Sequence, residues 1–214
     1  MKKLLLVLMF VFPMMAFAKA TDSTQDAGRF QEGTHYEVVK GLPSFTKPTV
    51  TELFSIYCGG CYQWEKGPLT PLKTWLGQQN IEFKQAHMTF MGAYAKQATM
   101  ALAMTQGTPR HNSVKQALFN RIHVERKGDW QNDKDFFQTM EKAGLKQSDF
   151  EANQNSLLVM KTVLDWNRYG EYVHAVPSFM VNNRYLINMG SLKSHDDLNA
   201  LITYLTKLPV EEKK

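Results

Sequence analysis

Two cysteines, three positions apart, are the residues of this chain whose type and spacing could most directly do chemistry. Cys58 and Cys61 are the only cysteines among the 214 residues, and Gly59 and Gly60 stand between them. A pair at this spacing can be redox-active, can supply half of a metal site, or can form a structural staple. The neighbouring residues and the expected compartment distinguish these possibilities.

The N-terminus indicates an exported protein. Lys2 and Lys3 form a basic region, residues 4–12 are apolar, and residues 16–18 read Ala-Phe-Ala, an A-x-A cleavage motif. The segment from residue 4 to residue 18 is shorter than the roughly 20 residues that a membrane-spanning helix requires. We therefore expect a signal peptide at 1–18 and a mature protein in the periplasm.

The composition is typical of a globular protein with a mixed surface. Apolar residues make up 43% and charged residues 21% of the chain. Removal of Lys2 and Lys3 lowers the formal net charge from +5 to +3, and the remaining charges alternate in sign. Because no block of basic residues is dense enough to bind a polyanion, we expect no nucleic-acid partner. We expect a monomer.

The two cysteines are best explained as a redox pair. Neighbouring thiols in an oxidising compartment rarely stay reduced, and a disulfide that closes so short a loop constrains the unfolded chain little. Zinc requires about four ligands, and the six histidines show no H-x3–5-H spacing. Tyr62 follows Cys61, which excludes a C-x-x-C-H haem attachment motif. We expect neither a metal nor an organic cofactor.

The elements around the pair would activate one of the two sulfurs. Residues 49–57 are rich in β-branched and aromatic side chains, which predicts a strand buried on both faces. A helix is predicted to begin near Cys61, with a kink at Pro68 and Pro71. Cys58 would then lie at the helix N-terminus, where unpaired N–H groups and the helix dipole favour a thiolate. Cys58 is therefore the candidate nucleophile, and Cys61 is its resolving partner.

The remaining strands and the last helix complete a sheet. Residues 35–39 and 81–88 predict two strands, and residues 176–190 predict a hairpin that turns at Asn182-Asn183. Ser194, with Asp197 three residues later, predicts the start of a final helix with an apolar stripe. The stripe consists of Leu198, Leu201, Ile202 and Leu205.

A helical block is predicted between the third strand and the hairpin. Gly144 is expected to cap one of its helices, and Ser148 with Glu151 is expected to form a capping box. The strand-type alternation is absent from this segment, which therefore reads as an all-α insertion. The expected helices span residues 94–105, 112–127, 133–143 and 155–169, with a short turn at 148–153.

Three motifs spread along the chain carry a family resemblance. Glu52 stands six residues before Cys58 in ELFSIYCGGC, His87 opens HMTFMG, and AVPSFMVNNRY occupies residues 175–185. With these motifs the chain resembles the DsbA family of periplasmic thiol–disulfide oxidoreductases over nearly all of its mature length. The resemblance implies an α/β thioredoxin fold with an all-α domain inserted between the third strand and the hairpin.

The resemblance implies that the chain is divided into four segments. These are the signal peptide (1–18), a first part of the thioredoxin fold (19–89), the helical insertion (90–164) and a second part of the thioredoxin fold (165–214). The resemblance also implies a cis peptide bond between Val176 and Pro177, facing the cysteines and shaping a groove for the substrate backbone. The alternative for Pro177 is the start of an edge strand. The catalytic set is then Cys58, Cys61, Glu52 and Pro177, with substrate contacts from Val176, Gly59, Gly60 and His174.

Glu52 is an acid in an apolar place. Glu52 alternates with Val50 and Phe54 along the predicted strand, so it should point to the same apolar side as they do. A buried carboxylate is costly unless it is paired or protonated. The resemblance implies that Glu52 accepts the proton of Cys61, while a structural ion pair is the alternative. The family carries a lysine near this acid on the third strand. Lys84 is the candidate here, although it stands three residues before His87 instead of the expected two.

The function that the resemblance implies is disulfide donation to unfolded or reduced exported proteins through a mixed disulfide at Cys58. A membrane DsbB-like, quinone-linked oxidase would reoxidise the pair. Strong oxidases of the family usually carry Pro-His where this chain has Gly59-Gly60. We therefore expect a potential between about −270 mV, as in thioredoxin, and about −120 mV, as in the family's namesake.

Two alternatives stay open at this point. The first is a disulfide reductase or isomerase that uses the same chemistry, and the second is a non-catalytic chaperone with this fold. The first predicted strand begins about sixteen residues after the expected cleavage site, which leaves no room for an N-terminal dimerisation domain and argues against an isomerase.

Overall fold

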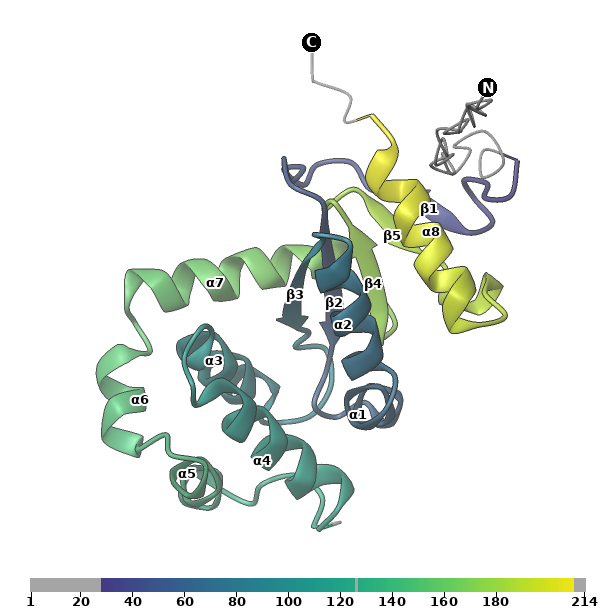
Figure 1. The fold of residues 1–214 in the computed structure, drawn as a ribbon. Coiled ribbons are helices and arrows are strands. Elements are labelled where there is room, and N and C mark those ends of the chain that lie inside the picture. Colours follow the sequence, from purple (N-terminus) through teal and green to yellow (C-terminus); the bar gives the residue numbers. More distant parts are fainter. Residues whose placement is uncertain (1–27, 126, 210–214) are drawn as a thin grey trace, which may run out of the picture.

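The computed structural model describes residues 28–125 and 127–209, so the expected signal peptide at 1–18 lies outside the described residues. A five-stranded sheet with the order β1-β5-β4-β2-β3 forms the centre of the molecule (Figure 1). β2 pairs in parallel with β3 and antiparallel with β4, and β5 pairs antiparallel with β4 and β1. The strands are β1 (Tyr36–Val38), β2 (Thr49–Phe54), β3 (Glu82–His87), β4 (Ser178–Val181) and β5 (Tyr185–Ile187).

β2 leads the chain from the middle of the sheet to the cysteines. All six of its residues are buried, as its β-branched and aromatic side chains predict. The strand ends at Phe54, three residues earlier than predicted, because the backbone then turns. The Cys58 N–H donates to the Ser55 carbonyl at 3.1 Å, and the Ile56 N–H donates to a side chain of β3.

One face of the sheet packs against α2 (Leu69–Gln78) and α8 (His195–Lys207). Val50 and Phe179 lie in this apolar cluster, together with the predicted stripe of α8. The Ser194 Oγ accepts the Asp197 N–H, which confirms the predicted start of that helix. The turn of the β4–β5 hairpin also forms as predicted, because Asn182 and Asn183 take φ values of 53° and 57° that this short turn requires.

The predicted helical block is present between β3 and β4. Figure 1 shows α3 to α6 beside the sheet, with α7 returning to it. A second apolar cluster joins these helices to the other face of the sheet, where Leu53 and Met180 lie. α7 runs across the predicted domain boundary at 164/165 and continues into a short 3-10 helix at Arg168–Glu171. The helices are α3 (Ala95–Thr105), α4 (His111–His123), α5 (Asp133–Lys142), α6 (Gln147–Asn153) and α7 (Leu157–Asn167).

The predicted kink at the two prolines is instead a break between two helices. α1 (Gly59–Lys66) is followed by Gly67, whose N–H caps its last turn, and α2 begins after Pro68. Pro71 falls in the first turn of α2, where the N–H that proline lacks would have no helical partner. The prolines therefore set a helix boundary and do not bend a continuous helix.

The capping box predicted from Ser148 and Glu151 is wrong. α6 begins at Gln147, so Ser148 lies inside its first turn and is not the capping residue. Glu151 instead accepts a hydrogen bond from the Gln147 side chain at 2.7 Å. Gly144 does follow the end of α5 with a φ of 89°, the left-handed conformation expected after a helix.

Within the described residues, none of the helices combines the length and the apolar character needed to cross a bilayer.

In the loop between β3 and α3, Gly92 occupies a position where any larger residue should destabilise the fold. Gly92 has a φ of 80°, and a Cβ there would meet the Tyr57 ring at 2.1 Å. That ring is held in place, because the Tyr57 hydroxyl donates to Asp129 at 2.7 Å. Gly107 has a similar φ of 75°, but open space surrounds the position of its missing Cβ.

We expect Gly107→Ala to cost about 1 kcal/mol for the backbone conformation alone. Gly92→Ala should cost roughly 2 kcal/mol more, because the methyl group overpacks a fixed ring. Urea unfolding of both variants measures the difference. Equal losses would contradict this account of the loop.

Candidate active site

Cys58 is the N-terminal capping residue of α1. Its backbone is extended, with φ −87° and ψ 114°, and its Sγ accepts the Cys61 N–H at 3.0 Å. The helix begins at Gly59, so the expected start near Cys61 was two residues too late. The two cysteines form a disulfide, in which Cys58 is 8% exposed and Cys61 is 1% exposed. Attack from solvent is therefore easier at Cys58.

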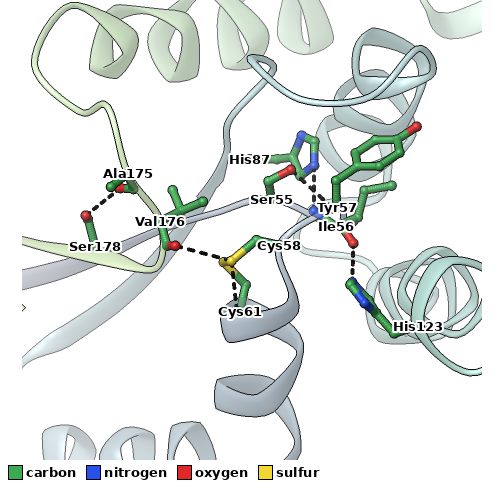
Figure 2. The surroundings of a disulfide bond; sticks show 10 residues. All are labelled: Ser55, Ile56, Tyr57, Cys58, Cys61, His87, His123, Ala175, Val176 and Ser178. Carbon is green, nitrogen blue, oxygen red and sulfur yellow. Dashed lines mark hydrogen bonds between the residues drawn. A yellow bond between two sulfur atoms is a disulfide. The ribbon is translucent and has the colours of Figure 1, made fainter.

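The loop before β4 faces this disulfide (Figure 2). The Val176–Pro177 peptide bond is cis, as the family resemblance implies, and the Val176 carbonyl oxygen lies 3.2 Å from the Cys58 Sγ. A Cβ at Gly60 would stand 3.3 Å from the Pro177 ring, whereas a Cβ at Gly59 would meet nothing within 4 Å. Gly60 thus faces Pro177 and Gly59 faces open space. His174 is exposed, three residues before Pro177.

Two histidines hold the peptide groups of Ile56, two residues before Cys58 (Figure 2). The buried His87, at the end of β3, accepts the Ile56 N–H at Nε2 (3.1 Å), and burial lowers the pKa of His87 to about 3. The His87 ring is therefore neutral, with its proton on Nδ1, which lies 2.7 Å from the Thr99 hydroxyl. His123, from α4, lies on the other side and places Nε2 2.8 Å from the Ile56 carbonyl oxygen.

The role of His123 could not be found from the sequence. Its contact with Ile56 spans 67 residues of chain. Its ring also stacks on Tyr62, the neighbour of Cys61, with centroids 4.9 Å apart. No local pattern encodes such a pair, because it depends on how α4 docks against α1.

Glu52 is buried, as predicted, with 1% of its surface exposed. Burial raises its pKa to about 7, although a hydrogen bond from the Gln85 amide at 2.7 Å opposes this rise. The expected partner Lys84 is not near the acid. It lies opposite Thr51 in the strand register and forms an ion pair with Glu82 at the surface, whereas Gln85 lies opposite Glu52.

A buried lysine from the helical insertion replaces the expected one. The Lys115 Nζ donates to the Gln85 Oε1 at 2.9 Å, and the Lys115 side chain is only 1% exposed. Lys115 could not be identified from the sequence, because nothing in the amphipathic pattern of residues 112–127 marks it as buried.

In the part of the chain that the structure describes, no three His, Cys, Asp or Glu side chains are grouped so that they could hold a metal ion. The chemistry available at this site is that of the disulfide, the buried acid Glu52 and the loop that faces the disulfide. A helix-capping disulfide that follows a central strand and faces a cis-proline loop defines a redox protein of the thioredoxin class.

Comparisons with known proteins show which members of the thioredoxin class this chain is similar to. No family model matches the chain. The thiol:disulfide interchange protein DsbL of Escherichia coli O6:H1 is 30% identical over 224 residues, which cover 96% of this chain and 99% of that protein. The protein DsbA of Yersinia pestis is 28% identical over 169 residues, covering 75% and 78%. The crystal structure of Salmonella enterica serovar Typhimurium DsbL matches with a TM-score of 0.72 at 25% identity, covering 84% of this chain and 98% of that one.

The chain therefore belongs to the DsbA family of thiol:disulfide interchange proteins, and it is a thiol–disulfide oxidoreductase. The thioredoxin fold with a helical insertion, expected from the sequence, is confirmed.

The buried acid predicts an unusual dependence of stability on pH. The pKa of Glu52 rises from an ordinary 4.5 to about 7 on folding, so the folded protein holds an additional proton between these values. The stability from Glu52 is thus fully present below pH 4.5 and is lost as the pH rises through 7. The full effect amounts to roughly 3 kcal/mol.

Glu52→Gln should remove this loss, so its free energy of unfolding relative to wild type should increase between pH 4 and pH 8. Urea unfolding at both pH values measures it. Glu82→Gln, which changes an exposed carboxylate on the neighbouring strand, is the matched control. A parallel pH dependence in wild type and Glu52→Gln would disprove the assigned shift.

Proposed function

We propose that this protein donates the Cys58–Cys61 disulfide to exported proteins in the periplasm. The observation that supports this most strongly is the position of Cys58 at the N-terminus of α1, with its Sγ accepting the Cys61 N–H. Such a position stabilises a thiolate after reduction. A protein whose reduced form is stabilised has a disulfide that readily oxidises other thiols.

Donation proceeds through two exchanges. A substrate thiolate attacks the Cys58 Sγ, the Cys58–Cys61 bond breaks, and the electron pair leaves on Cys61. A second substrate thiolate then attacks the substrate sulfur of the mixed disulfide, which forms the substrate disulfide and releases Cys58 as a thiolate. The substrate loses two electrons and the cysteine pair gains them.

Glu52 serves this exchange as an acid and a base. A carboxyl group with a pKa of about 7 is half protonated near neutral pH. It can therefore give a proton to Cys61 when that sulfur leaves, and take the proton back when the pair is reoxidised. The buried positions of Glu52 and Cys61 support this role, because water has little access to either.

The substrate binds along the loop that faces the disulfide. Val176 offers backbone groups beside Cys58, and Pro177 keeps the chain close without supplying an N–H that would compete for the sulfur. Gly59 and Gly60 leave room for a substrate backbone, and His174 contributes an exposed side chain at the rim. A DsbB-like membrane oxidase is the proposed partner for reoxidation.

The proposed direction of exchange is tested with reduced, unfolded ribonuclease A as substrate. The oxidised protein should form disulfides in it stoichiometrically, and Cys58→Ser and Cys61→Ser should both abolish this donation. In the reduced protein, iodoacetamide at pH 6 should label Cys58 before Cys61. Preferential labelling of Cys61 would overturn the assignment of the nucleophile, and reduction of insulin without ribonuclease oxidation would indicate a reductase.

A histidine at Gly60, but not at Gly59, is expected to make the disulfide a stronger oxidant. A side chain at Gly60 begins 3.7 Å from the Cys58 Sγ, so Gly60→His should place a donor beside the thiolate. We expect its reduction potential to rise by about 30 mV or more, a factor of ten in the exchange equilibrium. Gly59→His is the matched control, because its side chain enters open space.

Redox titration against glutathione measures both potentials. An equal rise in the two variants would mean that charge, not proximity to the sulfur, is responsible. No rise in Gly60→His would contradict the prediction.

A further inference from the structure

A chain of four polar side chains, of which Glu52 and Lys115 are buried and Gln85 and Glu65 partly buried, connects the helical insertion to Glu52. The Glu52 Oε2 accepts from the Gln85 Nε2 at 2.7 Å, and the Gln85 Oε1 accepts from the Lys115 Nζ at 2.9 Å. The same Nζ lies 2.9 Å from the Glu65 Oε1. The four residues come from β2, β3, α4 and α1, so α4 supplies the ammonium group for a site built by the sheet and α1.

The ammonium group of Lys115 contacts one carboxyl group directly and is linked to a second through an amide. Glu65 contacts Lys115 directly and also accepts a hydrogen bond from Gln116, whereas the neutral amide of Gln85 separates Glu52 from Lys115. A buried charge without a counter-ion is costly. Glu65 is therefore the direct carboxylate partner of Lys115, and Glu52 meets the ammonium group only through Gln85.

The charged groups that face Glu52 act in opposite directions. Burial raises the pKa of Glu52 most, the Gln85 hydrogen bond lowers it, the negative charge of Glu65 raises it, and Lys115 and Lys73 of α2 lower it. His87 on β3 is neutral, and burial together with Lys115 lowers the pKa of His111 on α4. The residues of β4 carry no charged side chain.

The network also reaches the helix face that carries the resolving cysteine. Cys61 and Glu65 stand four residues apart on α1, so they share one face of the helix. A change in charge at Glu65 or Lys115 therefore alters the proton affinity of Glu52, the proposed proton acceptor of Cys61.

We propose that Lys115 is a positioning residue that acts through Gln85 to favour the ionised form of Glu52, and that Glu65 limits this effect by pairing with Lys115. This inference rests on the proposed function of Glu52 as the proton acceptor of Cys61. In the resolving step, Cys61 gives its proton to Glu52 and attacks the Cys58 Sγ. The Cys58–Cys61 bond forms, and the departing thiol keeps the electron pair of the broken mixed disulfide.

Two substitutions test the proposal because they break the same ion pair with opposite effects on Glu52. Lys115→Met removes the positive charge and should raise the pH at which Glu52 ionises. Glu65→Gln keeps a hydrogen-bond acceptor but leaves Lys115 without its carboxylate, so it should lower that pH. Each shift should be about one pH unit. A purely structural ion pair would make both variants behave alike.

Two readouts are needed. The first is the ¹³C NMR titration of the Glu52 carboxyl group, assigned by its loss in Glu52→Gln. The second is the rate at which Cys61 releases glutathione from a mixed disulfide at Cys58, measured against pH. The midpoints of both should move up in Lys115→Met, down in Glu65→Gln and stay unchanged in Lys84→Met, a surface lysine on the strand next to the network.

Shifts of the same sign in the two variants, or no shift in either, would overturn the proposal. Opposite NMR shifts without a matching change in the release rate would overturn the role of Glu52 as the proton acceptor. If Lys115→Met does not fold, Glu65→Gln alone decides, and an unchanged or raised midpoint contradicts the inference. Ribonuclease oxidation by the wild type is scored separately, so failure of disulfide donation is distinguishable from failure of the network.

Discussion

The hydrogen bond from the Cys61 N–H to the Cys58 Sγ is the interaction on which the function depends. It places the more exposed sulfur of the pair at the N-terminus of α1, where free N–H groups and the helix dipole stabilise negative charge. The thiolate formed on reduction is therefore favoured at that position, and the disulfide becomes an oxidant. With Gly59 and Gly60 between the cysteines, this stabilisation comes from the backbone without help from a side chain in the motif.

The rest of the structure keeps that sulfur in place, and in the proposed mechanism the buried Glu52 exchanges a proton with Cys61. β2 carries the chain to the turn, and the histidines of β3 and α4 hold both peptide groups of Ile56. The cis-proline loop closes the opposite side. The helical insertion takes part directly, since α4 supplies both His123 and Lys115. Buried charge beneath an active-site helix costs stability, and such exceptions to ordinary burial are typical of functional sites.

Features encoded by neighbouring residues could be predicted from the sequence. The Asn182-Asn183 turn, the Ser194 cap and the location of Cys58 at the N-terminal end of a helix each depend on residues within a few positions of one another. The burial of Glu52 followed from the period of two along its strand. The family resemblance supplied the cis bond at Pro177.

Features set by packing between distant elements could not be predicted. The partner of Glu52 depends on strand register, in which a shift of one residue moves a side chain to the other face. That is why Gln85 faces the acid and Lys84 does not. Lys115 and His123 enter the site only because α4 docks beside α1, and no local pattern records that contact. The error at Ser148 had a local cause, since the helix begins one residue before it and leaves its hydroxyl group inside the first turn.

The most direct test is the titration of the Cys58 thiolate in the reduced protein, followed by absorbance near 240 nm. If the N-terminus of α1 activates this sulfur, the thiolate should persist well below pH 7, because the pKa of Cys58 then lies far under the ordinary thiol value of about 8.5. The signal should be absent from Cys58→Ser and retained in Cys61→Ser. A midpoint at or above pH 8 would contradict the account, since the helix end would then contribute nothing to the reactivity of Cys58.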